Sequence, residues 1–593
     1  MKKSATLGQS ILEMPSRPSN HVALKFKTKG NWKNKSWQQY YKDIETLGSA
    51  LLSQGIKAGD RVAIMANTCY EWSVSDFAIF GIKAITVPIY QNNTAEDVEY
   101  ILNNCEARAV FCECRGSLAT IESIKDNCPA LEKVFVFEER CHSPDVITWK
   151  DLRSAGEHYY KNHPTAFEKL CGAIKPEDTA TILYTSGTTG RPKGVVLTHL
   201  QAYSEVSEAF PYCGANSSDC SLSFLPYAHI LGRIEHWGHA YIGFTMAYAE
   251  SLEKIRNNLI DIRPTILVSV PRIFEKVYAG ILAQVQTKPL KQKVFDWAVE
   301  VGKQVGLHKM SGQILPIDLV VKYELAKKLV LGKITDAFGG RLRFAISGGA
   351  PISQDIALFF HAAGILILEG YGLTETTAAI TVNAPFNYRF GSVGRPIGET
   401  QLKIAEDGEI LVKSDKVMKE YYNDPEATKQ AFTDGWFHTG DIGELLPSGD
   451  LKITDRKKDL IKTAGGKYVA PQRLEGLLKL SPYIAQVLVH GDQKKYIVAL
   501  ITLDRPTVEQ IAKQMNIIYL NWNELIATPF VQEIVRQAVA EANSHLASFE
   551  SIKRYLILED EFTVEGGELT PSMKVKRKFL DNRYQDKIQS LYQ

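Results

Sequence analysis

Several features that mark other classes of protein are missing from this sequence of 593 residues. No run of 18 or more apolar residues could form a membrane-spanning helix. The basic start, Met1-Lys2-Lys3, is not followed by the apolar stretch of a signal peptide. The formal net charge is only +2, too small for a broad basic surface that binds nucleic acid. We therefore expect a soluble, cytoplasmic protein, with peripheral attachment to the inner surface of a membrane left open.

Cysteine is scarce and unevenly placed. The nine cysteines all lie between Cys69 and Cys220. The closest pair, Cys112 and Cys114, has no second pair or histidine doublet at the spacing of zinc ligands. Reduced thiols in a cytosolic protein explain this usage better than disulfides. Catalytic Ser/His/Asp and Cys/His patterns are also absent, so no protein nucleophile is expected.

Length and composition indicate a folded chain of several units. Hydrophobic residues make up 45% of the chain and charged residues 23%, an ordinary globular composition. Single cores stop growing near ~250–300 residues, so a chain of this length must divide into domains.

The first half of the chain alternates helical and strand patterns. Apolar residues recur at helical spacing over residues 36–54, and short apolar strands follow at 61–65, 84–88, 110–112 and 134–137. A second series has strands at 265–270, 342–346 and 365–368, with a long helical region over 271–338. Strands separated by helices predict parallel α/β layers.

The sequence pattern changes after about Gly408, where short strands and turn residues predominate. Residues 483–490 and 496–503 flank Gly491-Asp492 and read as a β-hairpin. The charged run Asp455 to Asp459 lies at this change. We place a domain boundary there, which gives units of 1–457 and 458–593.

A loop rich in glycine and threonine is the strongest chemical signal. It reads Tyr184-Thr185-Ser186-Gly187-Thr188-Thr189-Gly190-Arg191-Pro192-Lys193-Gly194. Apolar strands lead into and out of it. Its glycines allow close backbone approach to a ligand, and its amides, hydroxyls and Lys193 suit phosphate oxygens.

This loop is not the nucleotide loop of P-loop NTPases. The spacing GxxxxGK[ST] fails, and the loop lies between strands instead of opening a helix. The next helix is expected to start at Thr198, with Gln201 completing a capping box.

The loop resembles the phosphate-binding signature of the adenylate-forming enzymes, which include acyl-CoA synthetases, luciferases and the adenylation domains of peptide synthetases. Further motifs follow in the order of that family. Two of them, Ser347-Gly348-Gly349-Ala350-Pro351 and Glu369 to Thr376, each come after an apolar strand. The resemblance implies that these segments bracket the adenine, with Gly348, Gly349, Ala350, Glu369 and Gly370 near the base and Tyr371 stacked upon it. It also implies that Thr374 bonds the α-phosphate and that Glu375 binds Mg²⁺, which prefers oxygen ligands.

The later motifs add the ribose and hinge residues of the family. Trp436 to Asp441 ends in an aspartate that would accept hydrogen bonds from both ribose hydroxyls. Arg456 would reach the ribose or a phosphate, and Lys458 matches the hinge of the family. Gly465 and Gly466 resemble the segment that shapes the pantetheine tunnel.

Lys574, in Leu569-Thr570-Pro571-Ser572-Met573-Lys574, stands where the family has its adenylation lysine. The family more often has glycine before this lysine, and Met573 fits its long-chain fatty acyl branch. Lys576 and Lys578 are the alternatives. His229, in Leu225-Pro226-Tyr227-Ala228-His229, resembles the segment beside the acyl carboxylate, where substrate gating is favoured over proton transfer.

Together these motifs imply a ligase that uses ATP, Mg²⁺ and coenzyme A to convert a fatty acid, long-chain by resemblance, first to acyl-adenylate and then to acyl-CoA. The implied fold is a large α/β domain with a small barrel, followed by a mobile α+β domain that swings about Lys458. Three alternatives stay open: a ligase that transfers the acyl group to a carrier protein, a P-loop NTPase, and a regulator that binds adenylate without catalysis.

Overall fold

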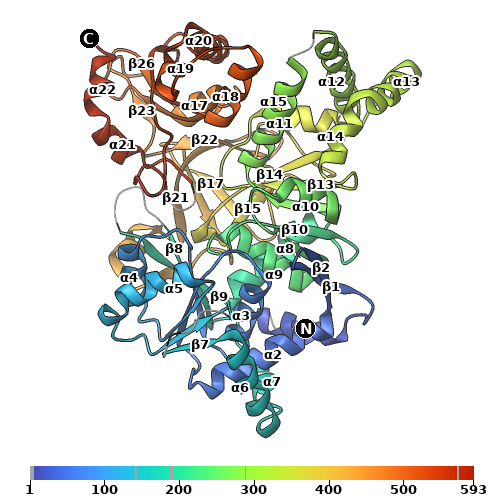
Figure 1. Cartoon of the computed structure of the whole chain (residues 1–593), viewed down its shortest axis with the longest axis vertical. Coiled ribbons are helices and arrows are strands. Elements are labelled where there is room, and N and C mark those ends of the chain that lie inside the picture. The colour runs from blue at the N-terminus through green and yellow to red at the C-terminus, as the bar shows by residue number, and fades with distance from the viewer. Residues whose placement is uncertain are drawn as a thin grey trace.

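The computed structural model describes residues 6–139, 143, 145–185, 191–286, 289–310, 312–570 and 573–593. Figure 1 shows layered sheets and helices in the N-terminal part and a smaller unit, coloured orange to red, that carries the C-terminus. Among the described residues, no helix is both long and apolar enough to cross a bilayer. The eight cysteines within these ranges are free thiols.

The largest sheet has eight strands in the order β19-β9-β8-β4-β3-β5-β6-β7. Its strands are β3 (Arg61–Met65), β4 (Ile85–Ile89), β5 (Ala109–Cys112), β6 (Lys133–Val136), β7 (Val146–Thr148), β8 (Thr179–Thr185), β9 (Lys193–Thr198) and β19 (Glu420–Tyr421). The pairs from β8 through β7 are parallel, whereas β9 runs antiparallel to both β8 and β19. The predicted parallel α/β arrangement is confirmed here, with an antiparallel edge.

Helices connect these strands where the sequence predicts them. They include α2 (Trp37–Ser53), α3 (Tyr70–Gly81), α4 (Ala95–Asn104), α5 (Arg115–Ile124), α6 (Trp149–Asn162) and α8 (His199–Tyr212). Thr198 caps α8, and its backbone N–H donates to Gln201 Oε1 at 2.6 Å, so the predicted capping box is present.

A second sheet positions the adenylate motifs. Its order is β12 (Ile266–Ser269), β13 (Phe344–Ser347), β14 (Leu366–Leu373), β15 (Ala378–Val382) and β16 (Arg395–Pro396), with β12, β13 and β14 parallel. The predicted helical region lies between β12 and β13 as α11 (Pro271–Gln286), α12 (Pro289–Met310), α13 (Ile317–Ala326), the π-helix η3 (Lys327–Leu331) and α14 (Gly332–Ala337). Helix α15 (Gln354–Ala362) then joins β13 to β14.

Two further sheets complete the N-terminal part. One has the order β10 (Cys220–Ser223), β11 (Thr245–Tyr248), β1 (Val22–Thr28) and β2 (Asn31–Ser36). The other is the small antiparallel unit, with β17 (Gln401–Ile404), β18 (Glu409–Lys413), β21 (Trp436–Leu445), β20 (Phe432–Thr433) and β22 (Leu451–Arg456). Helix α9 (Ile230–Ile242) lies between β10 and β11.

The C-terminal unit has its own apolar core. Its sheet is β25 (Ile484–His490), β26 (Ile497–Leu503) and β27 (Ile552–Ile557), and the antiparallel β25–β26 pair is the predicted hairpin. Its helices include α17 (Pro471–Leu478), α18 (Arg505–Gln514), α20 (Pro529–Ser544), α21 (Arg577–Arg583) and α22 (Gln585–Ser590). Buried residues of the N-terminal core end at Leu451 and those of this core begin at Ile461. The domain boundary that we predict at 457/458 falls between these two residues.

Candidate active site

Parallel pairing brings the two adenine-side motifs to one edge of the second sheet. Ser347 pairs with Glu369, so the turn at Gly348 and Gly349 emerges beside Gly370. This is the carboxyl edge of parallel strands, where open α/β sheets bind ligands. Gly349 has φ of +81°, a left-handed conformation that favours glycine over any residue with a side chain.

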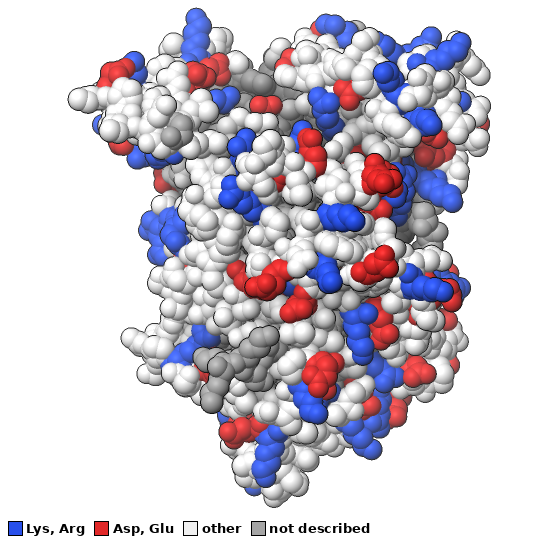
Figure 2. All heavy atoms as spheres, turned by 180° about the vertical axis from the view of Figure 1, so that it is seen from behind, with Lys and Arg blue, Asp and Glu red and all other residues white. Residues whose placement is uncertain are grey.

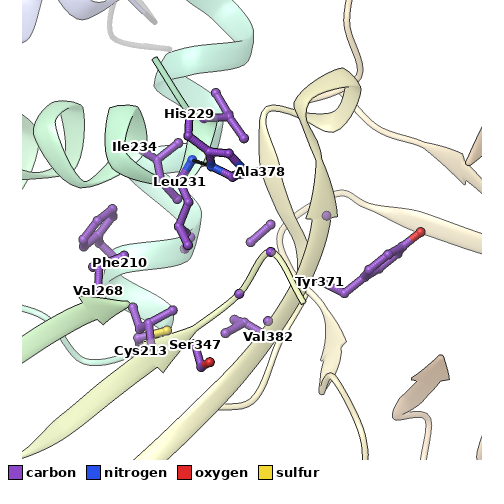
Figure 3. A pocket seen from close by; sticks show the side chains of 18 residues that line it. Phe210, Cys213, His229, Leu231, Ile234, Val268, Ser347, Tyr371, Ala378 and Val382 are labelled. Carbon is purple, nitrogen blue, oxygen red and sulfur yellow. Dashed lines mark hydrogen bonds between the residues drawn. The ribbon is translucent and has the colours of Figure 1, made fainter. Parts of the chain in front are cut away.

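An apolar cavity opens at this edge. The space between its walls, open solvent included, is about 610 Å³, of which about 50 Å³ can hold the centre of a water molecule. Its apolar lining comes from α8, α9 and the second sheet and includes Phe210, Cys213, Leu231, Ile234, Val268 and Val382. Figure 3 shows these side chains around the cavity, with the Tyr371 ring directed away from them. The segment Gly370–Gly372 therefore has an apolar pocket on one side and a polar cleft on the other.

His229 stands at the mouth of this cavity, at the N-cap of α9. Its Nδ1 accepts a hydrogen bond from the Leu231 backbone N–H at 3.2 Å. Burial, and then the charge of Lys574, lowers the pKa of His229 to about 3. A neutral imidazole that accepts at Nδ1 carries its proton on Nε2 and is a poor proton acceptor near neutral pH. This agrees with a gating role better than with proton transfer.

The polar side of the cleft is organised around Asp441. Strands β21 and β22 pair Asp441 directly with Arg456, and Arg456 Nε lies 3.3 Å from Asp441 Oδ1. The Tyr371 hydroxyl donates to the other oxygen, Oδ2, at 2.7 Å. Burial raises the pKa of the Asp441 carboxyl, and the Arg456 charge opposes that rise. One hydrogen bond and one ion pair thus join the three predicted nucleotide-binding residues in a single group.

Glu375 and Thr374 lie on the short 3-10 turn η4 (Thr374–Thr376) after β14. The hydroxyl of Tyr421, on β19, donates to Glu375 Oε1 at 2.9 Å. The Tyr421 ring in turn lies 5.0 Å from Nζ of Lys193. Strand β19 therefore joins Glu375 to the end of the phosphate loop, because β19 also pairs with β9. Tyr421 is a site residue that the sequence reasoning missed.

Two neighbouring turn residues have left-handed backbone conformations. Thr377 and Ala378 have φ of +53° and +78°, which costs ~1–2 kcal/mol per residue without glycine. The Thr377 hydroxyl donates to the Lys416 carbonyl at 2.6 Å, and the Ala379 N–H donates to Glu205 Oε1 at 2.9 Å. Contacts from two other segments therefore hold this strained turn.

Glu205 and Lys416 themselves form part of a buried charge cluster. Lys416 Nζ lies 2.9 Å from Glu208 and 3.9 Å from Glu205, and the side chains of Lys416 and Glu205 are at most 1% exposed. Burial raises the pKa of Glu205 to about 8, although Lys416 opposes the rise. No sequence pattern indicates this pair, because the neighbours of a lysine in the sequence do not show whether its side chain is buried or exposed.

Lys574 enters the same cleft from the C-terminal unit. Lys574 is an exposed residue. Desolvation nevertheless lowers the pKa of its amine, and the nearby Arg456 charge lowers it further, while Asp441 and Glu375 act in the opposite direction. Residues almost 350 positions apart, from His229 to Lys574, are thus electrostatic neighbours. The main-chain N–H of Lys574 donates to Thr570 Oγ1 at 3.0 Å, and Met573 has φ of +63°.

The remaining predicted site residues lie in different places. Ser186, Gly187, Thr188, Thr189 and Gly190 are outside the described residues. Thr185 ends β8, where its hydroxyl donates to the Lys193 carbonyl at 3.4 Å. Ala350 is exposed beside the glycine turn. The buried carboxylate of Glu369 lies in a separate small cavity, where it accepts from the Ile352 N–H at 3.2 Å and burial raises its pKa to about 8.

Lys458, Gly465 and Gly466 lie outside the cleft in this conformation. Lys458 is exposed just after β22. The two glycines form the turn between β23 (Ile461–Lys462) and β24 (Tyr468–Val469), and Gly466 has φ of +75°. The Ala464 N–H in the same turn donates to the main-chain carbonyl of Lys494, so the turn packs within the C-terminal unit.

The described residues hold no group of three or more His, Cys, Asp and Glu side chains that could bind a metal ion. Glu375 offers a single carboxylate beside the polar cleft. One carboxylate is enough for an ion whose other ligands are substrate phosphates and water, as is usual for Mg²⁺. The residues present therefore fit magnesium that is bound together with a nucleotide.

Comparison with known proteins agrees with this geometry. Residues 13–422 match the family model described as AMP-binding enzyme, and residues 458–593 match the one described as AMP-binding enzyme C-terminal domain. The chain is 36% identical to the long-chain-fatty-acid–CoA ligase FadD15 of Mycobacterium bovis, over 95% of this chain and 93% of that protein. It is 30% identical to long-chain-fatty-acid–CoA ligase 5 of Rattus norvegicus, over 94% of this chain and 84% of that protein.

Among solved structures, the anthranilate CoA ligase AuaEII in complex with anthranoyl-AMP has the same fold. The TM-score is 0.74 at 20% identity, with 98% of each chain covered. These matches extend over both units of the chain. The chain belongs to the AMP-binding enzyme family, the adenylate-forming enzymes, and resembles its long-chain fatty acyl-CoA synthetases.

Proposed function

We propose that the chain is a long-chain fatty acid–CoA ligase that activates its acid with ATP as an acyl-adenylate and then transfers the acyl group to coenzyme A. One observation supports the assignment of the adenylation site most directly. Lys574, from the C-terminal unit, lies in one cleft with Glu375, Asp441 and Arg456, next to an apolar cavity at His229. The relatives named long-chain-fatty-acid–CoA ligases support the acid and the acceptor.

The first step must bring two anions together. A carboxylate and the α-phosphate, as unit charges ~4 Å apart, repel by ~4 kcal/mol at an effective dielectric of 20. Lys574 and Arg456 supply positive charge where negative charge develops. A carboxylate oxygen then bonds to the α-phosphorus as the bond to the β-phosphate bridge breaks, and pyrophosphate leaves with the electron pair.

Glu375 would hold the magnesium ion, and Tyr421 would orient that carboxylate. When bound, Mg²⁺ adds positive charge to the phosphate oxygens. Asp441 would accept from the ribose hydroxyls once these displace one of its present partners. Gly348, Gly349 and Gly370 would allow the adenine to lie close to the backbone, and Thr374 would bond the α-phosphate.

The apolar cavity would take the acyl chain. It is lined by aliphatic and aromatic side chains, and it lies across Gly370–Gly372 from the polar cleft. A carboxylate at its mouth would meet His229, whose neutral ring suits a gate that moves when the acid enters.

The second step needs a thiol to reach the acyl carbon, and Lys574, which lies near Asp441 and Glu375 in this conformation, would be in its way. We propose that the unit 458–593 swings about Lys458, withdraws Lys574 and brings in the turn at Gly465 and Gly466. The CoA sulfur then bonds to the acyl carbon and AMP leaves. Such a motion would let one site run two reactions in turn.

The test is pyrophosphate release from ATP and Mg²⁺ with acids from acetate to oleate, with and without CoA. Release that requires a long-chain acid, together with acyl-CoA when CoA is added, is the expected result. Pyrophosphate release without thioester formation would indicate that a carrier protein, and not CoA, accepts the acyl group. Release with only short or aromatic acids would reject the fatty acid, and no release with any acid would favour a regulator that binds adenylate.

A further inference from the structure

Exposed apolar side chains are concentrated on one small part of this molecule. Of the twenty large apolar side chains that are strongly exposed in the described chain, nine lie between residues 289 and 333: Leu290, Leu307, Met310, Ile314, Ile317, Val320, Val321, Leu325 and Leu329. Ile314 is 94% exposed, Ile317 84% and Val321 65%. We call the surface that these nine residues form the α12–α13 face.

The pattern along α13 shows that this exposure belongs to the helix itself. Leu319, Tyr323 and Ala326 are buried on its inner side. Ile317, Val321 and Leu325 follow one another at intervals of four residues on the outer side, where a solvated helix carries polar residues. Each such side chain forgoes the favourable free energy that burial of its apolar surface would give. An apolar stripe of this extent marks an interaction site.

Charge around the α12–α13 face differs from that of the rest of the chain. Residues 289–333 contain eight lysines (Lys291, Lys293, Lys303, Lys309, Lys322, Lys327, Lys328 and Lys333) and four acids (Asp296, Glu300, Asp318 and Glu324). This segment therefore carries +4, whereas the whole chain carries +2, so the remainder carries −2. Two of the four acids are paired, Asp318 with Lys322 at 2.9 Å and Glu324 with Lys327 at 3.2 Å.

The α12–α13 face lies on a helical lobe that projects at the upper right of Figure 1, beside the C-terminal unit. Figure 2 shows the same lobe from behind, at the upper left, where white atoms form much of its outline and both basic and acidic side chains lie among them. The lobe connects to the acyl cavity through α15. Phe295 of α12 packs on Phe359 of α15 with ring centroids 5.9 Å apart, and α15 joins the two strands that line the cavity.

We propose that the α12–α13 face docks on an anionic lipid surface. Apolar side chains that enter the interface, ringed by lysines that reach lipid phosphates, are the features of helices that lie in a membrane surface. Each lysine near such a surface adds to the favourable free energy of binding. The biological role that we give to docking rests on the proposed function. Long-chain acids partition into lipid, and docking would bring the acyl cavity close to these acids. The binding itself does not depend on catalysis.

The test is co-sedimentation of the full chain with vesicles of phosphatidylcholine alone and of phosphatidylcholine with 30% phosphatidylglycerol. The variant Ile314→Ser/Ile317→Ser/Val321→Ser removes three of the four most exposed apolar side chains of this face. Ile518→Ser/Leu520→Ser is a matched control, since these residues of the C-terminal unit are 92% and 90% exposed. We expect the wild type and the control to bind the anionic vesicles, and the triple variant to bind at least ten-fold more weakly. High salt should also weaken wild-type binding.

Equal binding of the triple variant and the wild type would overturn the proposal. So would wild-type binding to neutral and anionic vesicles alike, because the lysines would then have no part. Light scattering without vesicles tests whether a second copy of the chain covers this face. If the wild type is a dimer and the triple variant a monomer, the face binds a second copy and not lipid. A thermal unfolding transition like that of the wild type checks that the variant is folded. If acid activation failed in the wild type while vesicle binding held, the proposed function would be wrong and this inference would stand.

Discussion

At the scale of single residues, the contact between Tyr421 and Glu375 is the most direct addition to the expected site. The hydroxyl donates to the carboxylate at 2.9 Å from a strand that also pairs with the end of the phosphate loop. Its role is to position Glu375, because nothing places Tyr421 against substrate. The residue lies in an aromatic segment, Tyr421-Tyr422, which predicts a strand but not this partner.

We expect Tyr421→Phe to raise the Mg²⁺ concentration for half-maximal pyrophosphate release by 3- to 10-fold, with a smaller change in kcat. The loss of one hydrogen bond, worth ~0.5–1.5 kcal/mol, accounts for this range. Steady-state assays at varied Mg²⁺ measure it. Tyr422→Phe is the control, since Tyr422 packs with the core of the large sheet. Unchanged Mg²⁺ dependence in Tyr421→Phe would show that the contact does no positioning.

Met573, next to Lys574, has a φ of +63°, which costs a residue with a side chain ~1–2 kcal/mol. The glycine that the family resemblance implies at this position would adopt this conformation without that cost. We expect Met573→Gly to retain adenylation at near the wild-type rate and Met573→Val to lose at least ten-fold, because a β-branched residue fits this conformation worst. Single-turnover formation of acyl-adenylate measures both. Equal rates for the two variants would mean that this turn does not set the position of Lys574.

At the scale of elements, sequence periodicity predicts most of the framework. The capping box at Thr198 and Gln201, the parallel strands of the large sheet and the β25–β26 hairpin all follow from local patterns. The strained turn at Thr377 and Ala378 does not, since its backbone is fixed by Glu205 and Lys416 from distant segments. Tertiary contacts of that kind leave no periodic trace in a sequence.

The buried Glu205 should give stability a particular pH dependence. Because burial raises its folded pKa to about 8 from an unfolded value near 4.5, the folded state holds the proton more tightly. The contribution of Glu205 to stability is therefore full below about pH 4.5 and is lost as the pH rises toward 8. We expect Glu205→Gln, which keeps an acceptor for the Ala379 N–H, to reduce this decline. Urea unfolding at pH 5.5 and 8 measures it.

In that experiment the gain in unfolding free energy from Glu205→Gln should be larger at pH 8 than at pH 5.5. Glu208→Gln is the control, because Glu208 also pairs with Lys416 but is 26% exposed. A gain of equal size at both pH values would contradict the assignment of the titration to Glu205.

At the scale of the whole molecule, the proposed mechanism needs the C-terminal unit to move. The charged run at the boundary and the separate cores on either side of it are consistent with this. The sequence predicts a boundary there because the pattern changes to short strands and turn residues. The conformation itself could not be predicted, because no pattern says which face of the C-terminal unit meets the cleft.

We expect Lys458→Pro to slow thioester formation at least ten-fold while acyl-adenylate still forms. Proline fixes φ near −65° and so restricts rotation at this residue. Lys458→Ala is the matched control, because it removes the same side chain and leaves the backbone free. Burst measurements of adenylate and of acyl-CoA separate the two steps. Equal losses in the Pro and Ala variants would assign the effect to the side chain and not to a hinge.

The claim on which the account depends is that Lys574 serves adenylation and not transfer, and Lys574→Ala tests it most directly. Its two half-reactions are measured separately: formation of acyl-adenylate from acid and ATP, and formation of acyl-CoA from supplied acyl-adenylate. The account predicts at least 100-fold slower adenylation with transfer within a few-fold of wild type, and near-normal adenylation in Lys576→Ala and Lys578→Ala. Equal loss of both half-reactions, or a larger loss of adenylation in either control, would contradict it.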